Sequence, residues 1–260
     1  MNESDVFHVA VMPPDQVNPE LISRVGEIVS QPEYQIRLLL AGRRPRIIGH
    51  FRDEAASAAA VQKLKDIGLK VFGVRESELR RTVIPRLIAR SVKIEGDSAI
   101  FTNRDGKTEM MKAAEVFLII TGRRIRMVGE AAVETSKMKV NLPATLLSGG
   151  IPIMKRVTSK NEEPRKVTEQ FIRLYRLNSD DPAVEITQFD FDYSFLAGGM
   201  GPTATGNIAA TAAAMRQWSD RAYFNDSLLS GFVAESRSIS GIDLGEKGCL
   251  LLVRYYRSLV

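Results

Sequence analysis

The stretch that decides the fold runs from Val6 to Val74 and reads VFHVAVMPPDQVNPELISRVGEIVSQPEYQIRLLLAGRRPRIIGHFRDEAASAAAVQKLKDIGLKVFGV. Short apolar runs typical of strands stand at both ends and around Ile47, and longer runs typical of helices fill the intervals. Almost no residues are left over between them. The order predicts a compact β-α-α-β-α-β unit, which usually presents a helical surface to partners and holds no catalytic centre.

Helix start and stop signals support this division. The first helix is expected to begin at Asn18–Glu20, because asparagine caps exposed amides and proline tolerates the first helical position. A second short helix is expected to begin at Gln31–Glu33, around Pro32, and to end at Gly42. Asp53 begins an alanine-rich third helix, and Gly68 ends it.

The segments PEYQIRLLLAGRRPRIIGHF and DEAASAAAVQKLKDIGLKVFGV give this region a resemblance to a known family. In order and spacing it resembles the C-terminal domain of the bacterial ribosomal stalk protein. The resemblance implies a domain over residues 1–76, and in the family such a domain recruits translational GTPases through a lysine-bearing helical face. Here Tyr34–Ala41 contains no lysine and the basic character moves to Arg43, Arg44 and Arg46, so the ribosomal function is not carried over.

Arginine is concentrated in the loop after the second helix and in a basic connector expected over residues 77–90. Ser77–Ala89 reads as a helical connector that Pro85 kinks or interrupts. The planar guanidinium fork binds carboxylate or phosphate through two hydrogen bonds. We therefore expect one arginine-rich surface that binds an acidic protein face or a phosphate-bearing partner, formed by Arg43, Arg44, Arg46, Arg80, Arg81 and Arg86.

Residues 91–260 read as a strand-rich domain. Short strands are expected from Ser91 to Ile125, and a hairpin with long arms is expected around the turn Ser179–Pro182. In its second arm, QFDFDYSF places aromatic residues at every second position, which predicts one buried sheet face. The same alternation places Asp190 and Asp192 on the solvated face and not in a catalytic pair.

After the hairpin, IAATAAAMRQW is expected to form a helix of small residues. Strands, a long loop, a hairpin and a closing helix over Ser91–Trp218 resemble the bacterial pleckstrin-homology-like split barrel. Domains of that family generally bind lipids, peptides or other proteins. Within Ser219–Val260, YFNDSLL and DLGEKGCLLLVRYYRSL are expected to add one or two helices. The predicted fold is α+β, a small β-α-α-β-α-β domain followed by a split β-barrel with C-terminal helices.

A glycine-rich loop before the closing helix is the alternative candidate for ligand binding. Backbone amides at a helix start can hold a phosphate, although the lysine of a P-loop and the dinucleotide fingerprint are both missing. In this alternative the protein is a nucleotide-binding or phosphoryl-ligand enzyme, with Lys155 or Arg156 brought to a loop formed by Gly198, Gly199, Gly201, Gly206 and Asn207.

The remaining chemistry-bearing residues indicate structural roles. His8 and His50 lie in predicted strands with no nucleophile suggested nearby, and no histidine follows residue 50. The one cysteine, Cys249, lies in the apolar run CLLLV and is expected to be a buried thiol. No spacing suits a zinc site, so neither a metal nor a cofactor is predicted.

The totals favour a cytoplasmic binding protein. The 260 residues carry a net charge of +5, which suits an anionic partner. No apolar run reaches the roughly 18 residues of a membrane span, and the acidic start MNESDVFHV does not fit a signal peptide. We expect a non-catalytic binding or scaffolding role with a protein partner. The alternatives left open are the phosphoryl-ligand enzyme and a nonspecific nucleic-acid binder.

Overall fold

The computed structural model covers the chain of 260 residues and describes all of it except residues 1–5, 129–135, 141–153, 159–164 and 231–243. The described residues divide into two units. The first combines residues 1–124 with 170–260, and the second spans 125–169. Within the second unit, strand β9 (Ser136–Val140) pairs antiparallel with β10 (Met154–Thr158). Both helices and strands occur, which confirms the α+β class.

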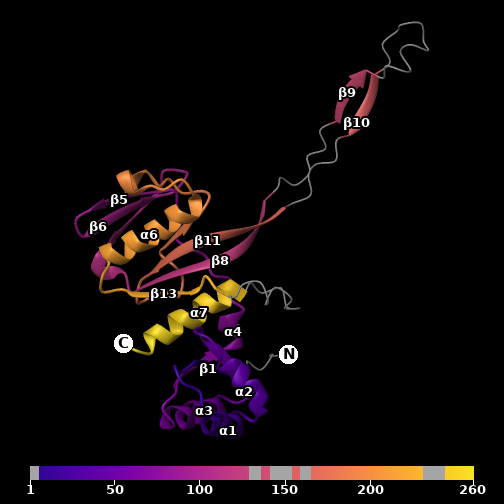
Figure 1. Cartoon of the computed structure of the whole chain (residues 1–260), viewed down its shortest axis with the longest axis vertical. Helices are drawn as coiled ribbons and strands as arrows, with labels where there is room; N and C mark the ends of the chain where they lie inside the picture. The colour runs from indigo at the N-terminus through magenta and orange to yellow at the C-terminus, as the bar shows by residue number, and fades with distance from the viewer. Residues whose placement is uncertain (1–5, 129–135, 141–153, 159–164, 231–243) are drawn as a thin grey trace. The chain divides into compact units, whose positions relative to one another are not determined.

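The first part of the chain forms a three-stranded sheet with its helices packed on one face (Figure 1). The strands lie in the order β2-β1-β3 and pair antiparallel. This three-stranded lobe has the predicted β-α-α-β-α-β order. Its elements are β1 (Phe7–Met12), α1 (Pro19–Val29), α2 (Glu33–Leu39), β2 (Arg46–Phe51), α3 (Glu54–Asp66) and β3 (Lys70–Arg75).

The predicted caps explain where these helices begin. The Asn18 side chain accepts a hydrogen bond from the amide of Leu21 at 2.8 Å, and the Asp53 carboxylate accepts one from Ala56 at 2.8 Å. Each cap satisfies a backbone donor that has no partner inside its helix. Gly42 and Gly68 have φ of 105° and 84°, a backbone region that glycine enters without strain.

The connector between the two predicted domains differs from the expectation. Helix α4 covers only Glu76–Leu79, and Leu87–Ala89 form strand β4. Strand β4 pairs parallel with β12 (Val184–Thr187), so that Leu87 lies opposite Val184. The prediction of a helical connector is therefore wrong beyond Leu79, because pairing with a distant strand outweighs the local pattern.

The rest of the first unit is built on two sheets. A five-stranded sheet has the order β13-β8-β11-β12-β4, and β5-β6-β7 form an antiparallel meander. No sheet among the described residues closes on itself, so the split barrel stays a prediction. The new elements are β5 (Ser91–Glu95), β6 (Ser98–Thr102), β7 (Thr108–Lys112), η1 (Ala113–Glu115), β8 (Leu118–Val128), β11 (Arg165–Tyr175), η2 (Ser194–Gly199), α6 (Ala204–Trp218) and β13 (Tyr223–Leu228).

The aromatic stretch after β12 is not the predicted long hairpin arm. Strand β12 ends at Thr187, and the chain then turns. The Tyr193 hydroxyl donates a hydrogen bond to the carbonyl of Gln188 at 2.7 Å, which closes this turn. Phe191 and Tyr193 are buried as expected, but Phe189 is 50% exposed. The alternation of aromatic residues thus reflects the burial of Phe191 and Tyr193 in a turn, and not a continuous strand.

The last helix, α7 (Leu244–Arg257), lies between the five-stranded sheet and the three-stranded lobe (Figure 1). One side of α7 packs on Leu118, Ile120, Phe171 and Tyr175 through Cys249, Leu252 and Val253. Another side packs on Ala10, Phe72 and Val74 through Leu250, Leu251 and Tyr255. The helix predicted from DLGEKGCLLLVRYYRSL is confirmed, whereas YFNDSLL forms strand β13 and not a helix.

Buried charges connect α7 to the sheet. The Arg173 side chain is 2% exposed and its Nε donates to Glu185, 1% exposed, at 2.7 Å. Its two terminal nitrogens donate to the carboxylate of Glu246 at 2.6 and 2.5 Å, and Arg124 donates to Glu185 at 2.7 Å. Because Glu246 lies in the first turn of α7, this network fixes one end of the helix.

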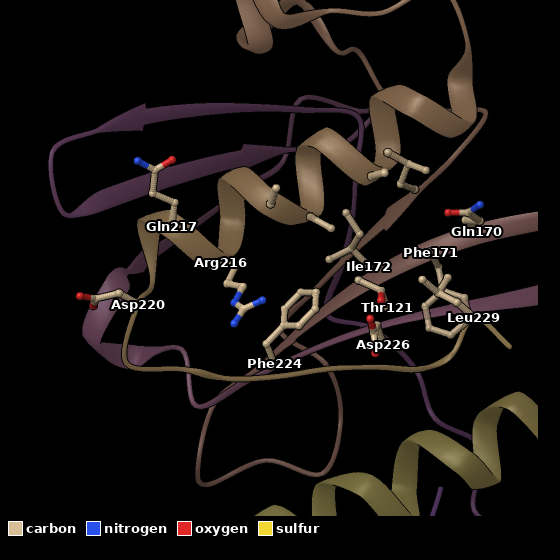
Figure 2. A pocket seen from close by; sticks show the side chains of 14 residues that line it. Thr121, Gln170, Phe171, Ile172, Arg216, Gln217, Asp220, Phe224, Asp226 and Leu229 are labelled. Carbon is tan, nitrogen blue, oxygen red and sulfur yellow. The ribbon is translucent and has the colours of Figure 1, made fainter. Parts of the chain in front are cut away.

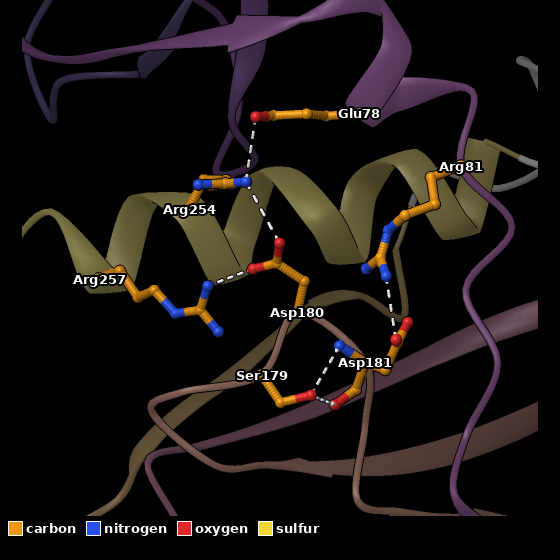
Figure 3. Close-up of polar contacts among 7 residues, drawn as sticks. All are labelled: Glu78, Arg81, Ser179, Asp180, Asp181, Arg254 and Arg257. Atoms are coloured by element: carbon orange, nitrogen blue, oxygen red, sulfur yellow. Dashed lines mark hydrogen bonds and ion pairs between the residues drawn. The ribbon is translucent and has the colours of Figure 1, made fainter.

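The other end of α7 is also held by ion pairs (Figure 3). Arg254 pairs with Glu78 of α4 and with Asp180, each at 3.2 Å, and Arg257 pairs with Asp180. A single helix thereby joins α4, the 179–182 turn and the five-stranded sheet. None of the described helices is long and apolar enough to span a bilayer.

Candidate binding groove beside helix α6

A groove of about 530 Å³ lies between α6 and the sheet, open along strand β13 (Figure 2). Helix α6 begins at its cap Thr203, whose hydroxyl accepts from the amide of Gly206 at 3.1 Å. Ala209 and Ala213 are too small to fill the space beside the helix, and this leaves the groove. It is lined by Thr121, Gln170, Phe171, Ile172, Ile208, Ala209, Ala212, Ala213, Arg216, Gln217, Asp220, Phe224, Asp226 and Leu229.

The floor of the groove is mainly apolar. Ile172 of β11 and Ile208 of α6 are buried there, next to Phe171. Thr121 of β8 is 4% exposed, and its hydroxyl has no hydrogen-bond partner among the described residues. A buried hydroxyl without a partner costs free energy, so a bound group that reached it would be stabilised.

The mouth of the groove carries the polar groups. The Arg216 guanidinium lies over the ring of Phe224, 5.0 Å from its centroid (Figure 2). Within the described part of the chain, Arg216 has no ion pair, although the carboxylates of Asp220 and Asp226 line the same groove. Arg216 can therefore form a fork of hydrogen bonds with an incoming carboxylate.

Strand β13 offers backbone groups along one side of the groove. It stands at the end of the five-stranded sheet, so its outer edge pairs with no described strand. The amide of Tyr223 donates inward to the carbonyl of Phe117 at 3.0 Å. Because successive residues of a strand point their backbone groups to opposite edges, those of Phe224 point outward, before the register shifts after Asn225. Such an edge can accept a further strand.

The glycine-rich loop, predicted as a phosphate-binding loop, has two of its backbone amides bonded to nearby side chains. The amide of Gly201 donates to the side-chain oxygen of Asn207 at 2.7 Å, and the amide of Gly206 is capped by Thr203. Gly198 and Gly199 are exposed. The loop thus uses two of its amides internally. The side chains of Lys155 and Arg156, predicted as its partners, lie outside the described residues.

The structure does not bring the six predicted arginines to one place. Arg46 lies opposite Val11 in the three-stranded sheet, and Arg43 and Arg44 precede it in the same loop. Arg75 lies opposite Phe7, at the other end of β1, and leads directly into α4.

The remaining three arginines lie beyond that end of the sheet. Arg80 donates to Glu76 at 2.7 Å. Arg81 donates to Asp181 at 3.0 Å (Figure 3), and the amide of Arg86 donates to the carbonyl of Pro182 at 3.0 Å. Arg81 and Arg86 therefore meet at the 179–182 turn, away from the loop that carries Arg43.

The two histidines form a chain of contacts that sequence reasoning missed. His8 lies opposite His50 in the sheet, and their Nδ1 atoms are 2.8 Å apart. Nε2 of His8 lies 2.6 Å from the carboxylate of Glu76, which also accepts from Arg80. The spacing of β1 and β2 could have suggested the histidine pair, but Glu76 arrives only through the end of β3. No group of three or more metal-ligating side chains occurs among the described residues.

The contacts among His50, His8 and Glu76 should make the protein less stable in mild acid. Burial, followed by the nearby His8, lowers the pKa of His50 below 6.5. The folded state then binds fewer protons than the unfolded state, so stability should fall as pH drops below about 6.5. Burial alone would raise the pKa of Glu76, but hydrogen bonds from Arg80 and His8 lower it, and its contribution is lost below about pH 4.5.

Urea unfolding at pH 7.5 and pH 5.5 tests this expectation. The midpoint should be lower at pH 5.5, and the drop should be smaller in His50→Gln, which cannot take up the proton. An equal drop in both proteins would contradict a role for His50.

Cys249 is 1% exposed, as predicted. Burial raises the pKa of its thiol to about 11, so it stays protonated at neutral pH. It is a core residue of α7. Comparisons of the chain with protein-family models, with curated proteins and with solved structures found no match.

Proposed function

We propose that this protein is a non-catalytic binding protein that captures an extended segment of a partner protein in the groove beside α6. The observation that carries the proposal is the combination, on one groove, of an apolar floor, an Arg216 at the mouth and an edge of β13, the last two without an ion pair or a neighbouring strand among the described residues. An extended peptide can pair with an edge strand while its alternate side chains enter a pocket.

The chemistry of the groove defines the segment. One apolar side chain would occupy the space over Ile172 and Ile208, and a carboxylate would bind Arg216. Asp220 and Asp226 line the same groove and disfavour a run of acidic residues. The expected segment is therefore mainly apolar and carries a single Asp or Glu.

Three further proposals concern the relationships of the two regions to known families and the location of the protein. The three-stranded lobe is proposed to be related to the stalk-protein domain, and the later region to pleckstrin-homology-like domains. Members of the second family bind peptides and proteins, which agrees with the groove. A cytoplasmic location is proposed for the same binding role.

Selection from a random peptide library displayed on phage tests the proposal. Enriched peptides should alternate apolar and polar residues and contain one Asp or Glu. Binding of a selected peptide is then measured by fluorescence anisotropy. Arg216→Gln should weaken it about tenfold or more, because a hydrogen bond to a charged group is lost. Ala213→Trp should abolish it by filling the groove.

Two exposed positions outside the groove provide controls. Arg104→Gln removes the same charge and Ala58→Trp adds the same bulk, and neither should change the affinity. Hydrogen exchange should show new protection of the Phe224 amide when the peptide binds. The proposal fails if no peptide is enriched, or if Arg216→Gln and Ala213→Trp bind as the wild type does.

A further inference from the structure

A second, more polar cavity of about 440 Å³ lies on the other side of β13. Three loops of the three-stranded lobe contribute to it, together with β13 and the last turns of α7. Its lining is formed by Met12, Pro13, Pro14, Asp15, Gly42, Arg43, Gly68, Leu69, Lys70, Phe224, Asn225, Asp226, Ser227, Tyr255 and Tyr256.

Two cations from separate parts of the three-stranded lobe line this cavity. Arg43 comes from the loop between α2 and β2, and Lys70 begins β3. Both are exposed, and neither forms an ion pair with a residue that the structure describes. An arginine and a lysine that line one cavity can both donate charge-assisted hydrogen bonds to an oxyanion.

A chain of hydrogen bonds orients a donor in the same cavity. Ser227 donates to the side-chain oxygen of Asn225 at 2.6 Å, and the Asn225 amide donates to the Tyr256 hydroxyl at 3.1 Å. The Tyr256 oxygen therefore acts as an acceptor, which leaves its own hydrogen for a group in the cavity. Burial raises the pKa of Tyr256, so the hydroxyl keeps that hydrogen at neutral pH.

The carboxylates limit what else can bind. Asp15 and Asp226 also line the cavity, so the lining has no excess positive charge. A polyphosphate would meet repulsion, whereas the carboxylates can accept hydrogen bonds from hydroxyl or amino groups. The cavity volume lies in the range of small-molecule sites, about 300–1,000 Å³, and exceeds that of a lone phosphate ion.

We propose that this cavity binds a small phosphomonoester whose phosphate contacts Arg43 and Lys70 and whose hydroxyl or amino groups contact Asp15 and Asp226. The organic part can be a nucleoside or a sugar, since both carry such donors. The inference does not depend on the proposed peptide groove, because Arg43, Lys70 and Tyr256 do not line that groove.

Isothermal titration calorimetry of the full chain tests the inference with AMP, UMP and glucose 6-phosphate. At least one of the three should bind with a Kd below about 1 mM. Inorganic phosphate and the matching compound without phosphate, adenosine, uridine or glucose, should each bind at least about tenfold more weakly. Binding of AMP or UMP alone would identify a nucleotide site, and binding of glucose 6-phosphate a sugar-phosphate site.

Variants separate this site from nonspecific attraction. Arg43→Gln with Lys70→Gln should weaken binding at least about tenfold, and Tyr256→Phe should weaken it less. The charge-matched pair Arg37→Gln with Lys63→Gln, exposed on α2 and α3, should leave the affinity unchanged. The inference is overturned if no phosphomonoester binds, if adenosine binds as tightly as AMP, or if both double variants behave alike.

Discussion

Replacing Arg173 by methionine should lower the free energy of unfolding by about 3–5 kcal/mol, because it leaves the buried carboxylate of Glu185 with Arg124 as its remaining charged partner. Glu185 is 1% exposed, so water cannot substitute for the guanidinium. Glu246, which loses two hydrogen bonds from Arg173, would also no longer hold the first turn of α7. In a chain of this size we expect the Tm to fall by roughly 6–20 °C.

Chemical denaturation followed by circular dichroism measures this change. A second variant, Arg173→Met with Glu185→Leu, should recover at least half of the loss, because it removes the buried carboxylate along with its buried partner. Lys93→Met breaks the exposed ion pair with Glu95 and should not move the midpoint. A loss below about 1 kcal/mol in Arg173→Met would show that the buried network is not a stabilising device.

Leu252→Ala should cost about 2–5 kcal/mol, since Leu252 is fully buried between α7 and the five-stranded sheet. The effect should not stay local. Loosening α7 from one sheet also weakens its contacts with Phe72 and Val74 of the lobe, because the same helix carries Leu250 and Leu251 to them.

Hydrogen exchange distinguishes a local from a shared effect. Amides of β3 should exchange faster in Leu252→Ala even though the substituted side chain faces the other sheet. Lys247→Ala, on the same helix and without a hydrogen-bond or ion-pair partner among the described residues, should change stability by less than about 0.5 kcal/mol. If β3 keeps its wild-type exchange rates, α7 does not couple the two sheets.

The three-stranded lobe could be predicted from sequence because its signals are local. Asn18 and Asp53 each cap a helix only three residues away, and Gly42 and Gly68 follow the helices that they end. Apolar periodicity then needs only to decide between helix and strand. No contact over long sequence distance was required to place these elements.

The errors lie where distant partners decide the structure. Leu87–Ala89 become a strand only because Val184–Ile186 lie beside them, and Tyr223–Leu228 only because β8 is already present. Neither segment carries a strong alternating pattern of its own. Conversely, FDFDYSF has the pattern but turns away after Thr187.

The candidate sites are harder to predict from sequence than the helices and strands, because they too depend on residues far apart in the chain. The groove arises because the small side chains of Ala209 and Ala213 leave space beside α6. No sequence motif marks such a space. The sequence predicts an anion-binding role for Arg43 but not for its proposed companion Lys70, since only the fold places both beside one cavity. Predicting the histidine pair would need the register between β1 and β2. Predicting its contact with Glu76 would need the position at which β3 ends.

The position of α7 has a consequence for how the chain is made on the ribosome. The lobe can bury its helix-covered face as soon as β3 has emerged, but Ala10, Phe72 and Val74 on the other face wait for Leu250 and Leu251. Those leucines are synthesised about 170 residues later, which at ordinary elongation rates means roughly 10–35 s. During that interval the nascent lobe exposes an apolar sheet face to solvent or to chaperones, until α7 is synthesised and covers it.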